Sequence, residues 1–195
     1  MQSVSLEDLT LKQKDCYEKV IDFMTKSYVM CPILTLSGST GVGKRTVLRA
    51  AIQNSKLEPF TVYDCTKEQI KAILFNGGGR IGDTKKVFVF ENPTTLDCKC
   101  ILESMGKLGD DHENRVIIVT SGKNSSSVRK VIKKRSSYVT LWNSSVRDMK
   151  RIVQKKKGRE YTYLITSFDG DIRNTLLQVE FNSINSSFCC FYVKR

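Results

Sequence analysis

Residues 38–46 read Gly38-Ser39-Thr40-Gly41-Val42-Gly43-Lys44-Arg45-Thr46, and this stretch decides the fold. An apolar run precedes it at 33–36, and residues 46–52 continue it with the apolar spacing of a helix. A strand, a glycine-rich loop and a helix in that order are the context of a phosphate-binding loop. The glycines let backbone N–H groups converge on an anion, and the helix N-terminus adds partial positive charge. The stretch therefore predicts a site for nucleotide phosphates, with Lys44 reaching the outer ones.

The residue after Lys44 departs from the usual pattern. Arg45 stands where a Ser or Thr hydroxyl normally binds Mg²⁺. Thr46 is one residue further on, so it is rotated by about 100° around the helix. We expect ATP to bind, with Thr46 and Glu91 as the candidate Mg²⁺ ligands, and we expect hydrolysis to be weak.

Two candidate catalytic residues follow a second apolar run. Residues 86–90 have the continuous apolar character of a parallel strand buried on both faces, and Glu91 and Asn92 come next. In phosphate-loop enzymes an acid at this place holds Mg²⁺ or its water. An amide such as Asn92 cannot accept a proton from water, but it can orient one. The structural alternative is a strand that ends on an exposed acid.

Apolar runs and helical patterns alternate along most of the chain. We expect an α/β fold of the P-loop NTPase type, with a parallel sheet and helices on both faces, over residues 1–143. Residues 144–195 are expected to form part of a small helical lid with an atypical tail. The expected strands are 33–36, 60–64, 86–91, 115–120 and 138–141, and the expected helices include 67–75, 96–108 and 128–132. Asn124 follows the strand at 115–120, where a γ-phosphate could be sensed.

Composition narrows the functional classes. Hydrophobic residues make up 40% and charged residues 27% of the 195 positions, which is ordinary for a globular protein. No apolar run approaches the length of a membrane span. The seven cysteines include no C-x-x-C pair and there is one histidine, which argues for reduced, structural thiols and a cytosolic or nuclear setting.

Positive charge is concentrated in one segment. The net charge is +12, and residues 121–160 hold thirteen Lys or Arg and two acids, a net charge of +11. The segment is either a solvated basic face or a surface for a polyanion such as DNA. Lys133, Lys134 and Arg135 are the candidate contacts to DNA or to a neighbouring subunit.

A second motif lies near the end of the sequence, where Gly170-Asp171-Ile172-Arg173 opens an amphipathic helical pattern. This turn resembles the second sensor motif of AAA+ clamp-loader ATPases, in which the arginine reaches the nucleotide phosphates. The sequence Glu91-Asn92-Pro93 and the ending at 177–183 are most similar to the large-subunit family of the DNA-damage-checkpoint clamp loader, which is related to replication factor C. The residues expected to contact the nucleotide are then Gly38, Ser39, Thr40, Gly41, Val42, Gly43, Lys44, Arg45, Thr46, Asn124 and Arg173.

The resemblance implies ATP-dependent loading of a sliding clamp onto DNA, in checkpoint signalling and DNA repair in the nucleus. The implied partners are the replication factor C small subunits, the checkpoint sliding clamp and DNA bound without sequence preference. Arg135 would be the candidate for a finger that reaches a neighbouring active site. The sequence lacks the collar by which loader subunits assemble, so we expect a monomeric fragment or competing isoform.

Two other functional classes remain open at this point. A small P-loop kinase shares the phosphate loop but needs a site for a phosphoryl acceptor. A degenerate ATPase that only binds partners would keep the fold and lose the chemistry.

Overall fold

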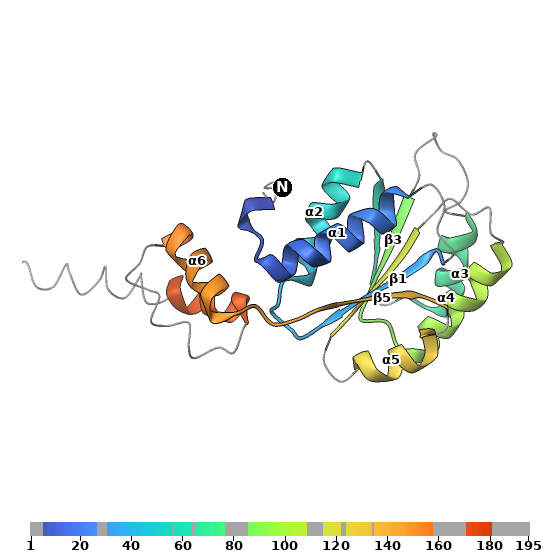
Figure 1. Ribbon diagram of the computed structural model, residues 1–195. Helices are drawn as coiled ribbons and strands as arrows, with labels where there is room; N and C mark the ends of the chain where they lie inside the picture. Colours follow the sequence, from blue (N-terminus) through green and yellow to red (C-terminus); the bar gives the residue numbers. More distant parts are fainter. Residues whose placement is uncertain are drawn as a thin grey trace, which may run out of the picture.

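Five parallel strands form one sheet in the order β2-β3-β4-β1-β5 in the computed structural model (Figure 1). The structure describes residues 6–26, 31–55, 57–63, 65–76, 86–108, 115–121, 124–133, 135–157 and 171–180. The strands are β1 (Ile33–Gly38), β2 (Glu58–Val62), β3 (Lys86–Glu91), β4 (Arg115–Thr120) and β5 (Ser137–Leu141). The helices are η1 (Leu6–Asp8), α1 (Leu11–Thr25), α2 (Lys44–Ser55), α3 (Lys67–Asn76), α4 (Thr95–Leu108), α5 (Asn124–Ile132) and α6 (Val146–Lys157), and a further helix spans residues 172–180.

Helices cover both faces of the sheet, because successive strand residues point to opposite sides. Leu34 and Leu36 of β1 pack on one face against α1 and α2, whereas Ile33 packs on the other face in a cluster with α3, α4 and α5. Figure 1 shows the two helical layers on either side of the strands. The expected α/β architecture is confirmed, and it is consistent with a P-loop NTPase-like fold.

The last two described helices form a separate small cluster. Met149 and Val153 of α6 pack against Val179 of the 172–180 helix. The Ser145 hydroxyl accepts a hydrogen bond from the backbone N–H of Asp148 at 3.1 Å, so the expected cap of α6 is present. In Figure 1 this pair of helices lies at one end of the molecule, beyond the end of β5.

Element boundaries differ from the expectations in a few places. Strand β2 begins at Glu58 and includes Pro59, which an edge strand tolerates because its outer N–H groups need no partner strand. Helix α5 begins at Asn124 rather than Val128, and α2 begins at Lys44. Residues 167–170, Lys134 and the tail at 184–195 lie outside the described residues. Within the described part of the chain, no helix has the length and apolar character needed to cross a membrane.

Candidate nucleotide-binding site

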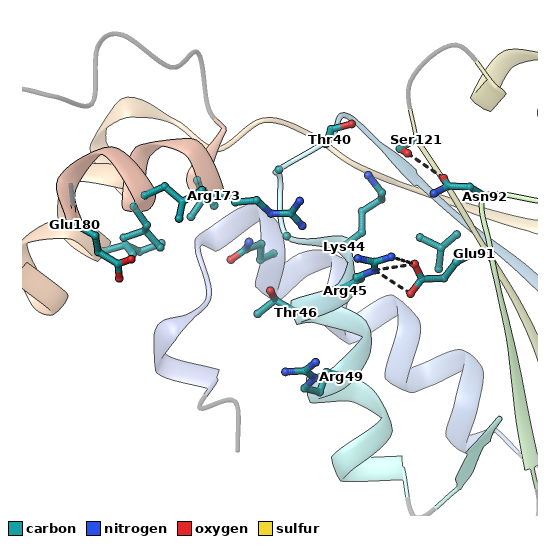
Figure 2. A pocket seen from close by; sticks show the side chains of 18 residues that line it. Thr40, Lys44, Arg45, Thr46, Arg49, Glu91, Asn92, Ser121, Arg173 and Glu180 are labelled. Atoms are coloured by element: carbon teal, nitrogen blue, oxygen red, sulfur yellow. Dashed lines mark hydrogen bonds and ion pairs between the residues drawn. The ribbon is translucent and has the colours of Figure 1, made fainter. Parts of the chain in front are cut away.

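A cavity of about 640 Å³ lies where the phosphate loop faces the small helical cluster. One side is formed by the loop, the start of α2 and the ends of β3 and β4, and the other by α6 and the 172–180 helix. Figure 2 shows side chains from both sides directed into it. The cavity therefore joins the two motifs that the sequence separates by about 130 residues.

Two loop glycines are required by the surrounding structure. Gly41 and Gly43 have φ angles of 81° and 98°, a region that residues with a side chain rarely adopt. A Cβ on Gly41 would overlap the carboxylate of Asp171, and a Cβ on Gly43 would overlap the amide of Gln13. The loop is thus enclosed by α1 on one side and by the start of the 172–180 helix on the other.

Lys44 is buried under the loop. Its ammonium donates hydrogen bonds to the carbonyl oxygens of Gly38 at 2.8 Å and Ser39 at 2.7 Å. The pKa of Lys44 is lowered from its usual value, chiefly by burial and then by the charges of Arg173 and Arg45. An anion in the cavity would offset this repulsion among cations, so the site favours a negatively charged ligand.

Arg45 and Glu91 form an ion pair inside the cavity. The Arg45 Nε lies 2.9 Å from Oε1 and 2.7 Å from Oε2 of Glu91, and the Arg45 Nη2 also donates to Oε2 (Figure 2). The Glu91 side chain is 8% exposed and that of Arg45 is 60% exposed. The hydrogen bonds to Glu91 raise the pKa of the Arg45 guanidinium. Both carboxylate oxygens of Glu91 are therefore occupied by the protein's own cation.

In this conformation, Thr46 and Glu91 do not form a Mg²⁺ site. The expected ligands Thr46 and Glu91 both line the cavity, but Arg45 holds the carboxylate that the metal would need. Among the described residues there is no group of three His, Cys, Asp or Glu placed to hold a metal ion.

Asn92 is held beside Glu91 in an uncommon conformation. Its φ of 49° lies in the left-handed region, which asparagine tolerates better than most residues. Its N–H donates to the carbonyl of Val119 at 2.7 Å, and its side-chain oxygen accepts the hydroxyl hydrogen of Ser121 at 2.9 Å (Figure 2). Because the amide oxygen is used by Ser121, the amide NH₂ is the end that can serve a ligand or a water.

The lid side of the cavity combines one cation with an apolar wall. Arg173 extends from the 172–180 helix toward the phosphate loop in Figure 2. Asp171 caps that helix, because its Oδ1 accepts the N–H of Asn174 at 3.0 Å. The apolar wall consists of Ile152, Ile172, Leu176 and Leu177. A flat apolar group can lie on this wall while a charged group meets the loop.

In comparisons with known proteins, no family model matches the chain and no curated protein is significantly similar to it. The function must therefore be argued from the site.

The structure brings most of the expected site residues together. Thr40, Gly41, Gly43, Lys44, Arg45, Thr46, Glu91, Asn92 and Arg173 line the one cavity. Val42 packs instead into the core beside α2, and Gly38 and Ser39 contribute carbonyls to Lys44. Asn124 is the first residue of α5, and its side chain is outside the described set. Lys133 and Arg135 are exposed and line no part of the cavity.

Sequence reasoning missed Gln13, Arg49 and Glu180, which also line the cavity. The pattern Thr10-x-x-Gln13 is a capping box that predicts the start of α1, and both of its hydrogen bonds are present, but it does not indicate that the Gln13 amide reaches the loop. Arg49 follows Arg45 by four residues, so the helical spacing predicts that both lie on the same face of α2. Nothing in the local pattern distinguished Glu180 from any other surface acid.

Proposed function

We propose that this chain is the ATP-binding module of an AAA+ clamp loader of the DNA-damage-checkpoint type. The observation that carries the proposal is the single cavity in which Lys44 of the loop and Arg173 of the lid face a shared space. Their positions correspond to those that the sequence motifs assign to nucleotide phosphates. The phosphates would lie along the loop and the base against the apolar wall of Ile172, Leu176 and Leu177.

Hydrolysis by this module is expected to be weak. A water attacking the γ-phosphate needs a carboxylate or a metal-bound network to activate it. Glu91 is engaged by Arg45 through both oxygens, and Asn92 can orient water without accepting its proton. Binding of ATP rather than its turnover would then be the active event.

Exposed basic residues on α5, just after it and on α6 support the DNA part of the proposal, and the two helices lie in different parts of the molecule (Figure 1). These residues are Arg129, Lys130, Lys133, Arg135, Arg147, Lys150, Arg151 and Lys155. Three of them also have contacts within the protein: Arg129 lies 4.8 Å from the centre of the Tyr138 ring, Arg151 donates to the carbonyl of Leu9, and Lys155 lies 3.6 Å from a carboxylate oxygen of Glu7. Exposed cations bind phosphate backbones without reading sequence. The proposed partners in the nucleus are DNA, the checkpoint sliding clamp and the replication factor C small subunits.

Calorimetric titration with ATP tests the proposal. Lys44→Ala should weaken binding at least about tenfold, or about 1.4 kcal/mol, because it removes the buried charge beside the loop. Lys99→Ala is the matched control, since Lys99 is an exposed lysine of α4, on the opposite face of the sheet from α2. Equal affinities of wild type and Lys44→Ala would rule out this cavity as the ATP site.

A further inference from the structure

The place of the metal in a phosphate-loop site is defined by two groups. One is the side chain that follows the loop lysine, and the other is the acid at the end of a nearby strand. In this chain the first group is Arg45 and the second is Glu91, and they bind each other through three hydrogen bonds. A guanidinium therefore lies against the carboxylate that would otherwise face Mg²⁺ (Figure 2).

A divalent ion at Glu91 would have to displace this pair. A bidentate arginine–carboxylate contact is among the stronger side-chain interactions, and here the carboxylate is nearly buried. The displaced guanidinium of Arg45, on the first turn of α2, would remain close to the ion, and the two positive charges would repel each other. The geometry thus opposes a metal at this place even when phosphate is present.

The cavity is already cationic without a metal. Among the described residues, four basic side chains line it, Lys44, Arg45, Arg49 and Arg173, against the two acids Glu91 and Glu180. Arg45 neutralises Glu91, which removes the negative charge closest to the position of the phosphates. The exposed part of its guanidinium can still donate to a phosphate oxygen, because the group has five N–H donors.

We propose that Arg45 takes the place of Mg²⁺ in this site, so that the chain binds ATP without a divalent cation. The inference rests on the proposed function and adds the form in which the ligand is bound: the protein supplies no ligand to a metal ion, so ATP and its magnesium complex are bound alike. Glu91 then positions Arg45 rather than a metal ion.

Titration of the wild-type protein with ATP, in EDTA and again in excess Mg²⁺, is the first test. The two dissociation constants should agree within about threefold, a difference below about 0.7 kcal/mol. Arg45→Thr restores the usual hydroxyl and releases Glu91, so its binding should become at least about tenfold tighter in Mg²⁺ than in EDTA. Arg45→Lys is the control that keeps the positive charge, and it should remain indifferent to the metal.

Manganese provides a readout that does not depend on nucleotide affinity. In the presence of ATP, electron paramagnetic resonance should detect Mn²⁺ bound to Arg45→Thr in addition to the nucleotide's own Mn²⁺, and no such protein-held ion in the wild type. Thermal melts establish that the variants fold, which is expected because the Arg45 side chain is 60% exposed.

Three results would overturn the inference, and they are distinguishable. Wild-type binding that needs Mg²⁺ would refute the role of Arg45 and leave the ATP site intact. An Arg45→Thr variant that stays indifferent to the metal would show that Arg45 does not occupy the metal's place. Absence of ATP binding under both conditions would remove the proposed function together with the inference.

Discussion

Replacing Gly38 with Ala should destabilise the fold at the base of the phosphate loop. Gly38 is the last residue of β1 and is paired with Leu141 of β5. A Cβ at this position would overlap the main-chain carbonyl oxygen of Leu141 and lie 3.3 Å from Cγ2 of Val42. The carbonyl belongs to a paired strand, so it cannot rotate away as a side chain would. Overpacking of this kind costs about 1–3 kcal/mol.

Thermal and urea unfolding followed by circular dichroism measure this effect. At about 2–4 °C per kcal/mol for a chain of this size, Gly38→Ala should lower the Tm by about 2–12 °C. Gly106→Ala is the matched control, because Gly106 lies in α4 with no atom within 4 Å of the added carbon. Alanine is the better helix former, so this variant should gain up to about 1 kcal/mol. A Gly38→Ala protein that melts with the wild type would refute the reasoning, since it would mean that β1 and β5 do not approach so closely.

Gln13→Ala should lower the free energy of unfolding by about 1–3 kcal/mol, because the buried Gln13 amide both caps α1 and donates to the Val42 carbonyl at 2.9 Å. Gln69→Ala is the matched control, because the exposed Gln69 forms the same capping box with Thr66, and it should cost about 1 kcal/mol or less in the same urea titrations. Equal losses would show that the bond to the loop contributes nothing. Burial raises the pKa of Cys16 to about 11 and that of Cys98 to about 12, so the folded protein holds these protons more tightly than the unfolded chain does. The free energy of unfolding is therefore unaffected by these thiols below about pH 9, and above it falls by up to about 1.4 kcal/mol per pH unit for each thiol. Cys98→Ala should make this fall shallower when unfolding is measured between about pH 8 and pH 10.

The sheet was predictable from sequence because its central strands are buried on both faces. Residues 87–90 and 116–119 are continuous apolar runs, and they lie in strands with the expected bounds, 86–91 and 115–120. The edge strand β2 was misplaced by two residues, because its first four residues are exposed and carry no apolar pattern. Local pattern fixes an element only where the core constrains it.

The individual residues of the site were predictable from sequence, but their contacts with one another were not. The sequence marks Arg45 as a departure from the usual Ser or Thr and Glu91 as a catalytic candidate, but the two are 46 residues apart. Their pairing depends on the strand order, in which β4 lies between β1 and β3, and on the reach of an arginine across it. No rule of spacing supplies that information. The capping box at Thr10 and Gln13 predicts the start of α1 but not the contact with the loop, since the exposed Gln69 forms the same box with Thr66 away from the cavity.

Among the described residues, the two walls of the cavity belong to clusters of very different size. The loop side emerges from β1, which has a hydrogen-bonded strand on each side and belongs to a core cluster of sixteen buried residues. The described part of the lid side packs in a cluster with three buried members, Met149, Val153 and Val179, and Ile172 and Leu176 are partly buried against it. Local unfolding begins where few apolar contacts must be broken. We therefore expect the described lid helices to open more readily than the sheet, and a ligand touching both walls to slow amide hydrogen exchange mainly in those helices.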